Sequence, residues 1–312
     1  MRFVVDATAR ARCLVQGPDA AAFVHRMSTQ HTSDLKDGDA RLNVLTTDKG
    51  RIVDVVHHVV TGDGVLLLGV RDGGADLVGW LDRYFFTEKL TLVDLAATSS
   101  MVIADAATTA ALVPGAEGLA PWQARTAGAL VAVRTFDVVD HDGAAVAAFV
   151  VLNRAPSLPS TPGAPLPAAT LSADEWRALS VAAGIPVDEI GDAATPLDLG
   201  LHDAIHWAKG CYIGQEVIAR LDTYGKQRKR LVGVIADEGS FAAGDAVLVA
   251  GSAVGALTSV AAPWSPALPR ALALVKGVDV EADGGVAAVV RGRDGEVPVR
   301  LQGRRAAQAP HD

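Results

Sequence analysis

The sequence predicts an α+β protein followed by a separate small β domain, and three features of the 312-residue chain carry this prediction. Up to about residue 155, short apolar runs alternate with segments whose apolar residues follow helical spacing. Residues 155–168 contain five prolines, which predicts a loop or linker. From residue 228 onward, six short apolar runs, mostly separated by glycine-containing turns, predict a small antiparallel barrel or sandwich.

The elements of the first region follow from two periodicities. Apolar runs at residues 65–70 and 130–133 predict strands, and helical spacing at residues 19–27 and 73–86 predicts helices. This mixture, without a regular strand-helix repeat, is typical of an α+β arrangement.

Two helix-start signals follow the proline-rich segment. Ser172 and Glu175 stand three apart, a capping box that opens an amphipathic helix, and Gly184 can close that helix. Residues 195–198 place a proline at the first helical position and an acid at the third. They predict a second helix that Gly210 would end.

The C-terminal region has the character of a β domain. We place its boundary near residues 224–227, which divides the chain into a region of residues 1–224 and a domain of residues 225–312. The six runs expected to form its strands are residues 231–236, 246–250, 255–260, 271–275, 286–290 and 297–301.

Composition and charge exclude several classes of protein. Lys and Arg number 28 against 36 Asp and Glu, so the net charge of -8 gives no global positive field for nucleic acid. The longest apolar stretch, residues 144–152, is far short of the ~20 residues that a membrane-spanning helix needs, and the N-terminus has no signal-peptide core. The only cysteines, Cys13 and Cys211, cannot form a disulfide framework. We expect a cytoplasmic protein without membrane or direct nucleic-acid contact.

Residues 209–220 form the most unusual local sequence, KGCYIGQEVIAR. This segment resembles the K-G-C-Y-x-G-Q-E signature of the YgfZ-type folate-binding proteins, which are relatives of the aminomethyltransferase (T-protein) of glycine cleavage. Seven fixed identities in eight positions, one of them a cysteine, are more specific than a short glycine pattern. Weaker likeness covers most of the chain, at residues 17–23, 46–54, 183–186, 195–197 and 254–259.

The resemblance implies a fold and a function. The fold would be a GcvT-like folate-binding domain of two ferredoxin-like halves around a central hole, followed by the small barrel. The cofactor would be tetrahydrofolate or a one-carbon derivative. The protein would assist the assembly, maintenance or repair of iron-sulfur proteins through transient contact with them or with their assembly factors, and so indirectly support tRNA methylthiolation. A thiolate is a suitable soft ligand for iron-sulfur chemistry.

The resemblance also assigns site residues, with Cys211 as the working residue. The other motif positions expected to serve it are Lys209, Tyr212, Gln215 and Glu216 as further catalytic candidates, and Gly210, Gly214 and Arg220 in the motif loop.

The residues around Cys211 have opposing effects on its thiol. Glycines at 210 and 214 allow a sharp turn and close approach to the sulfur. A helix starting near Gly214 and the charge of Lys209 favour the thiolate, whereas Glu216 opposes it. The direction of the thiol pKa therefore stays open. Cys13 lies in an apolar run and is expected to be a small buried hydrophobe.

Two acids are candidates for folate contact. The carboxylate of Asp198 suits the amide and amino edge of a pterin, and Asp54 lies where T-proteins carry two consecutive acids. Here the second acid is replaced by Val55. Relatives frequently carry an Arg and a Glu, two positions apart, just before the A-G-I-P run. This chain has Ser180 and Ala182 at those positions, which predicts weaker folate binding or a different pose.

Two other functions stay open. One is an aminomethyltransferase that moves a one-carbon unit to tetrahydrofolate, against which Val55 and the cysteine signature count. The other is a folate-binding scaffold without chemistry. Whether the protein is an enzyme is undecided; if it is one, one-carbon transfer is the implied reaction. His202 and His206 stand four apart, but we expect surface or partly buried histidines and no metal site.

Overall fold

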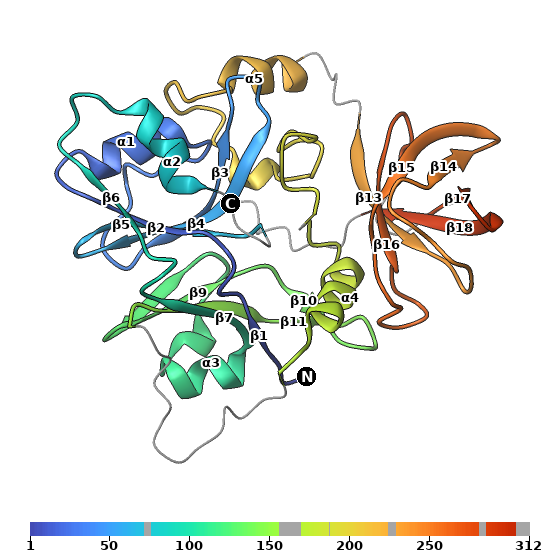
Figure 1. Ribbon diagram of the computed structural model, residues 1–312, viewed down its shortest axis with the longest axis horizontal. Helices are drawn as coiled ribbons and strands as arrows, with labels where there is room; N and C mark the ends of the chain where they lie inside the picture. Colours follow the sequence, from blue (N-terminus) through green and yellow to red (C-terminus); the bar gives the residue numbers. More distant parts are fainter. Residues whose placement is uncertain (72–75, 156–169, 187, 224–228, 281–284, 304–312) are drawn as a thin grey trace.

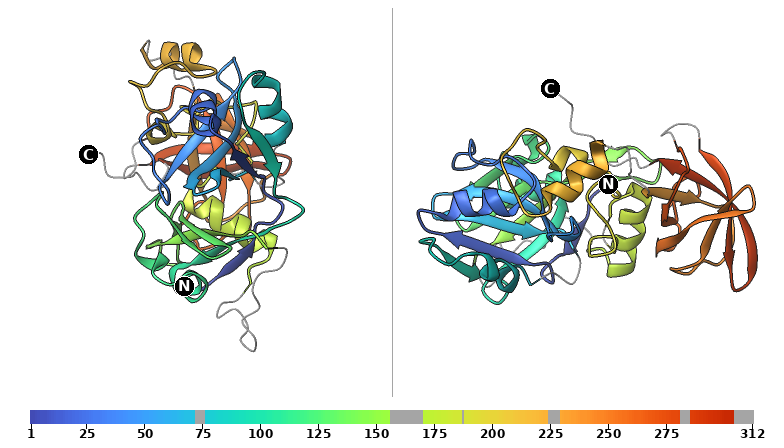
Figure 2. Two further views of the ribbon diagram at one scale, coloured as in Figure 1. Left: turned by 90° about the vertical axis from the view of Figure 1, so that its left-hand side faces the viewer. Right: turned by 90° about the horizontal axis from the view of Figure 1, so that it is seen from above.

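The computed structural model describes residues 1–71, 76–155, 170–186, 188–223, 229–280 and 285–303. In these residues the β structure consists of two five-stranded sheets, a separate two-stranded sheet and a six-stranded barrel. One helix lies between the five-stranded sheets and the barrel (Figures 1 and 2). The proline-rich residues 156–168 and the predicted boundary at 224–227 lie outside the described residues.

The first sheet is antiparallel and has the order β3-β4-β5-β2-β6. The helices α1 and α2 pack on the face of this sheet that points away from the second sheet. Residues 73–75 of the helix predicted at 73–86 lie outside the described residues. Within residues 76–86 the helix is shorter than predicted, because α2 is followed at once by a 3-10 turn. The elements are β2 (Arg12–Gln16), α1 (Ala20–Met27), β3 (Ala40–Thr46), β4 (Ile52–Thr61), β5 (Gly64–Gly69), α2 (Leu77–Leu81), η1 (Asp82–Tyr84) and β6 (Thr91–Asp94).

The second sheet is also antiparallel, with the order β1-β7-β12-β9-β8. The helix α3 packs on its outer face, and the Asp105 carboxylate accepts bonds from the first amides of that helix. The elements are β1 (Val4–Asp6), β7 (Ser100–Asp105), α3 (Ala106–Leu112), η2 (Ala116–Gly118), β8 (Ala124–Ala127), β9 (Leu130–Arg134), the hairpin β10 (Val138–Val139) and β11 (Ala145–Val146), and β12 (Ala148–Asn153).

The inner faces of the two sheets meet in one apolar cluster. Val55 of β4, Ile103 of β7 and Val150 of β12 belong to it, as does Leu179 from the helix after the proline-rich segment. Burying such side chains is the main favourable term in folding, at about 25 cal/mol per Å² of apolar surface. The α+β prediction is confirmed, whereas the central hole stays a prediction.

The helix predicted after the proline-rich segment is confirmed as α4 (Ala173–Ala183). The Ser172 hydroxyl accepts from the Glu175 amide and the Glu175 carboxylate accepts from the Ser172 amide, so the capping box is complete. Gly184 ends the helix with φ of 70°, a left-handed conformation that glycine adopts without strain.

The second predicted helix, from residue 195 to Gly210, is wrong. Thr195 and Asp198 do form reciprocal side-chain bonds to each other's amides, as at a helix start. The chain then makes one turn and reaches Gly200 with φ of 64°. Only a 3-10 turn, η3 (His202–Ala204), follows. Leucines at 197, 199 and 201 are all buried. The backbone amides of Leu199 and Gly200 close the turn on the carbonyls of Thr195 and Leu197, so no helix continues from it.

The six C-terminal strands are confirmed, and they close into a barrel of order β13-β16-β15-β14-β17-β18. A helix, α5 (Gln215–Thr223), precedes them and matches the short helix expected after Gly214. The strands are β13 (Arg230–Ile235), β14 (Ala246–Val249), β15 (Ser252–Val260), β16 (Ala271–Val275), β17 (Val286–Gly292) and β18 (Gly295–Gly303).

The barrel is joined to the rest of the molecule through α4 and the segment after it. Thr258 and Ser259 of β15 donate hydrogen bonds to the buried Glu189 carboxylate at 2.6 and 2.5 Å. The Arg177 guanidinium of α4 donates to the Val260 carbonyl at 2.9 Å. Among the helices of the described segments, none has the length and apolarity needed to span a bilayer.

Candidate functional site

The two cysteines lie in opposite environments. Cys211 is exposed, in the loop that precedes α5, whereas Cys13 of β2 is fully buried. Burial raises the pKa of the Cys13 thiol to about 12, so that group stays protonated at neutral pH. The thiolate is the nucleophile and the metal ligand. Of the two thiols, Cys211 is therefore the one that another molecule can reach. Its role as the working residue stays a prediction.

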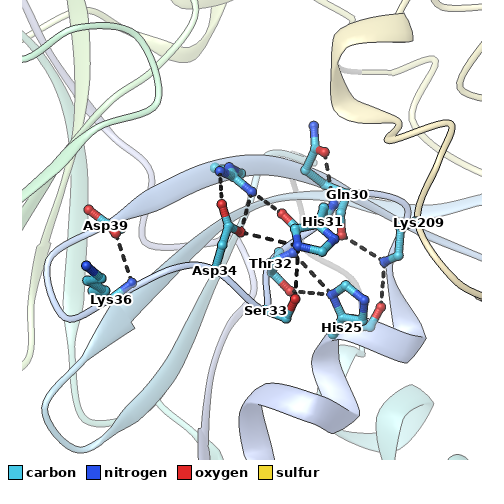
Figure 3. Close-up of polar contacts among 10 residues, drawn as sticks. His25, Gln30, His31, Thr32, Ser33, Asp34, Lys36, Asp39 and Lys209 are labelled. Carbon is cyan, nitrogen blue, oxygen red and sulfur yellow. Dashed lines mark hydrogen bonds and ion pairs between the residues drawn. The ribbon is translucent and has the colours of Figure 1, made fainter.

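The Lys209 side chain is almost fully buried and is bound at its tip. Its Nζ donates hydrogen bonds to the carbonyls of His25 and Gln30 at 2.7 and 2.8 Å (Figure 3). It also donates to the Ser28 carbonyl at 2.7 Å. Burial lowers the pKa of Lys209 to about 8. The pKa of His25 is lowered to about 4, first by the burial of its own ring and then by the nearby charge of Lys209. A neutral His25 is consistent with its Nδ1 accepting from the Thr32 amide at 3.1 Å.

The Tyr212 ring is part of the packing beneath the loop. It lies in a small apolar cluster with Leu197, Ile205 and Ile218. The Lys209 Nζ lies 5.4 Å from the ring centroid, within the range of a cation-π contact. Burial raises the pKa of the Tyr212 hydroxyl to about 12. Its phenol is therefore protonated at neutral pH.

The two glycines of the motif differ in their surroundings. Gly214 has φ of 85°, and a Cβ there would lie 2.5 Å from the Thr47 carbonyl oxygen. Next to it the Thr46 hydroxyl donates to the Ile213 carbonyl at 2.5 Å, so the loop sits directly on the β3-β4 turn. Gly210 is exposed, has no left-handed φ, and has open space around a hypothetical Cβ. Close approach therefore explains a glycine at 214 and does not explain one at 210.

The remaining motif positions lie at the start of α5. The Gln215 amide donates to the Tyr212 carbonyl at 3.2 Å, which closes the turn before the helix. Glu216 is 85% exposed and forms an i,i+4 ion pair with Arg220 at 2.9 Å. Exposed pairs of this type contribute little to stability. The charge of Glu216 is thus balanced by Arg220.

Sequence reasoning missed residues 29 and 30, which bind the segment just before the motif, residues 203–206. The Thr29 hydroxyl donates to the Ala204 carbonyl at 2.6 Å, and the Gln30 side chain donates to the Asp203 carbonyl at 2.8 Å. The His206 amide donates to the Thr29 carbonyl at 3.0 Å. These partners are more than 170 residues apart in sequence, so no local pattern could have indicated them.

Asp54 lies on β4 and is fully buried. Its Oδ1 accepts from the Arg71 amide at 3.2 Å, whereas its Oδ2 has no hydrogen-bond partner among the described residues. Burial raises the pKa of this carboxyl to about 7. A Cβ on Gly69 would lie 2.5 Å from Oδ2, so the glycine makes room for the acid. A carboxyl in this state can donate as well as accept a hydrogen bond.

Asp198 lies in the buried turn beside the barrel. Its Oδ2 accepts from the Thr195 amide at 2.9 Å, and its own carbonyl accepts from the Leu231 amide of β13 at 2.9 Å. The residue therefore ties the turn to the barrel. The sequence expectation that it also contacts a pterin stays a prediction.

The histidines give no metal centre. The rings of His25 and His31, and of His31 and His206, have centroids 5.1 Å apart. His202 and His206 do not share a helix face, since only the 3-10 turn η3 is present there. In the described part of the chain, no three His, Cys, Asp or Glu side chains are grouped so as to hold a metal ion.

Comparison with known proteins adds to this geometry. Residues 3–106 match the GCVT N-terminal domain family. A chloroplastic protein of Arabidopsis thaliana, named as a candidate transferase, is 27% identical over 275 residues, which cover 82% of this chain and 61% of that protein. The chain thus spans less than two thirds of that relative. An aminomethyltransferase of Picosynechococcus sp. is 27% identical over 271 residues, which cover 83% of this chain and 73% of that protein. An aminomethyltransferase of Rubrobacter xylanophilus is 28% identical over 304 residues, which cover 92% of this chain and 78% of that protein.

A solved structure has the same fold. The glycine cleavage system aminomethyltransferase T from Bartonella henselae matches with a TM-score of 0.79 and 17% identity, covering 97% of this chain and 86% of that one. The GcvT-like α+β fold and the C-terminal barrel predicted from the resemblance are therefore confirmed. The matched domain family, the aminomethyltransferase relatives and the shared fold together support a place for this chain in the GcvT-related superfamily.

Proposed function

We propose that the protein is a folate-dependent accessory factor for the assembly, maintenance or repair of iron-sulfur proteins, with Cys211 as the working residue. Its effect on tRNA methylthiolation would be indirect, through iron-sulfur enzymes. Iron-sulfur proteins or their assembly factors would be transient partners. One cysteine cannot hold a cluster alone, so stable ligation would need thiolates from the partner.

The presentation of Cys211 is the observation that carries this proposal. The thiol is exposed, while the residues on both sides of it are fixed to the first sheet region by Lys209 and by Gly214. Free cysteines are among the most buried residue types. An exposed thiol on a well-anchored loop is therefore suited to contact with another molecule, and packing does not account for it.

Folate would be held by buried acids of this chain. The orphaned Oδ2 of Asp54, in the space that Gly69 leaves for it, suits a pterin N–H. One carboxylate oxygen of Asp198 is used by Thr195, and the other is the candidate for a second contact. When bound, tetrahydrofolate would supply the carrier for a one-carbon unit.

An aminomethyltransferase is the second candidate, because several similar proteins carry that name. Val55, fully buried beside Asp54, stands where the T-protein pattern has a second acid. That replacement removes a carboxylate from the position and counts against transfer chemistry of the T-protein type. A folate-binding scaffold without chemistry would have no use for an exposed Cys211.

Complementation tests the proposal. A bacterial strain lacking its own YgfZ-type protein would receive this protein, Cys211→Ser or Cys13→Ala, with iron-sulfur enzyme activity and tRNA methylthiolation as readouts. We expect rescue by the wild type and by Cys13→Ala, and none by Cys211→Ser. Rescue by Cys211→Ser would reduce Cys211 to a structural residue. Failure of all three at normal expression would favour the transferase, which a direct assay of one-carbon transfer to tetrahydrofolate then checks.

A further inference from the structure

We propose that Lys209 is a positioning residue, which caps the C-terminal end of α1 and thereby holds the motif loop so that the Cys211 thiol stays exposed. This assignment rests on the proposed role of Cys211. It differs from the expectation that Lys209 supplies a positive charge to the sulfur.

The end of α1 explains why an ammonium is needed there. The last carbonyls of a helix have no partner inside the helix, and its C-terminal end carries partial negative charge. In α1 the Val24 carbonyl accepts from the Ser28 hydroxyl at 2.7 Å. The carbonyls of His25, in the last turn, and of Ser28, the residue after the helix, accept from Lys209 Nζ. The cap therefore comes from a residue about 180 positions later in the chain.

The ammonium has no donor left for the thiol. A lysine carries three N–H donors, and here they are directed to the carbonyls of His25, Ser28 and Gln30. Lys209 is 6% exposed, so these carbonyl oxygens, and not water, surround the ammonium. Lys209 thus acts on Cys211 through the backbone that joins them.

The anchor at Lys209 complements a second one at the other end of the loop. There the Thr46 hydroxyl binds the Ile213 carbonyl, and Gly214 packs against the Thr47 carbonyl. Two fixed ends leave only residues 210–212 between them. Tyr212 points into the apolar cluster with Ile218, which leaves Cys211 on the outer side. If the first anchor is removed, the loop can turn the thiol inward, where free cysteines are more stable.

Alkylation kinetics and hydrogen exchange test the proposal without any client protein or folate. Lys209→Met keeps the aliphatic stem and removes the ammonium. Lys276→Met, beside the barrel strand β16, is the matched control. Lys276 is exposed, and within the described part of the chain it forms a hydrogen bond through its backbone amide, to the Val254 carbonyl, and none through its ammonium. The rate of iodoacetamide reaction at Cys211 is measured from pH 7 to 10, which separates the thiol pKa from the plateau rate of the thiolate. Because burial lowers the pKa of Lys209 to about 8, the wild-type ammonium is itself lost within this range, so the wild-type profile is also compared with that of Lys209→Arg, whose guanidinium stays charged.

We expect Lys209→Met to lose exchange protection at residues 25–32 and 209–214 and to lower the plateau rate at Cys211 by about threefold or more, with the thiol pKa unchanged. Lys209→Arg, which keeps the charge but not the three-fold donor geometry, should restore the rate in part. A mere loss of global stability would not change the plateau rate of the folded protein. The control should match the wild type.

Two results would overturn the assignment. A raised thiol pKa with an unchanged plateau rate would show that Lys209 acts on the sulfur by its charge. No difference from Lys276→Met in either readout would show that the cap has no influence on the loop. If Lys209→Met does not fold, the same comparison is made with Lys209→Arg, whose plateau rate must then fall below the wild-type value. Complementation by Cys211→Ser would contradict the proposed function and leave this outcome unaffected.

Discussion

Substitution of the two motif glycines by alanine separates packing from access in the loop. Gly214 adopts φ of 85°, and an added Cβ would meet the Thr47 carbonyl oxygen at 2.5 Å and the Thr46 hydroxyl oxygen at 2.8 Å. Real Cβ atoms do not approach backbone oxygens so closely, so the loop must move away from the β3-β4 turn. At Gly210 the same hypothetical Cβ would have no atom within 4 Å among the described residues other than its chain neighbours. The pair is thus a matched test within one motif.

The expected cost of Gly214→Ala follows from two contributions. The left-handed backbone costs a residue with a Cβ about 1 to 2 kcal/mol. Displacement of the loop also breaks the hydrogen bond from Thr46 to the Ile213 carbonyl, which contributes about 1 kcal/mol. Gly214→Ala should therefore destabilise the loop by about 2 to 3 kcal/mol. Gly210→Ala should be neutral or stabilising by up to about 1 kcal/mol, because alanine restricts the unfolded chain.

Hydrogen exchange of the amides at residues 213–218 is the assay, since exchange reports the free energy of local opening. Urea unfolding followed by circular dichroism measures the global effect beside it. Equal exchange in Gly214→Ala and Gly210→Ala would refute the reasoning. It would mean that the contact with the β3-β4 turn does not hold the loop.

Three further outcomes follow from other sites. A disulfide reagent at neutral pH should label Cys211 in the native protein and leave Cys13 unlabelled until urea is added. Cys13 is fully buried, and burial raises the pKa of its thiol to about 12. Mass spectrometry of the labelled peptides measures this difference. Burial raises the pKa of the Asp54 carboxyl to about 7 in the folded protein, so the folded state keeps this proton at pH values where the unfolded chain has lost it. The free energy of unfolding should therefore fall as the pH rises from about 4 to 7, by up to about 4 kcal/mol. Asp54→Asn should flatten that part of the pH profile in urea titrations, and an unchanged profile would count against a buried acid. Ser172→Ala should cost about 1 kcal/mol, since it removes the acceptor for the Glu175 amide, and Asp174→Ala on the exposed first turn, measured in parallel, should cost less.

The sequence predicted those elements whose signals lie within a few residues. The capping box of Ser172 and Glu175 and the left-handed Gly184 are local features, and both formed as expected. The six barrel strands were also found, because apolar runs between glycine turns carry their own pattern. The helix expected from residue 195 failed although its start signal formed, because a start signal does not fix the length of the helix.

The contacts of the site were beyond local patterns. Lys209 looked like a charge for the neighbouring thiol because it is two residues away in sequence. The structure directs its ammonium to the carbonyls of His25, Ser28 and Gln30 instead. Only the packing of the motif against α1 decides between these two roles, and that packing joins segments separated by most of the chain.

The burial of the motif residues bears on which of them carries chemistry. Lys209, Tyr212 and Gly214 each have a packing reason for their identity, namely a helix cap, an apolar cluster and a backbone contact. Gly210 and Cys211 are exposed, and nothing in the described part of the chain requires a glycine or a thiol there. A residue type that the fold does not explain is explained by what approaches from outside. Because Gly210 has no side chain, space is left next to the sulfur. A bulky substitution such as Gly210→Phe should therefore leave stability unchanged while it slows the reaction of Cys211 with large thiol reagents more than with small ones.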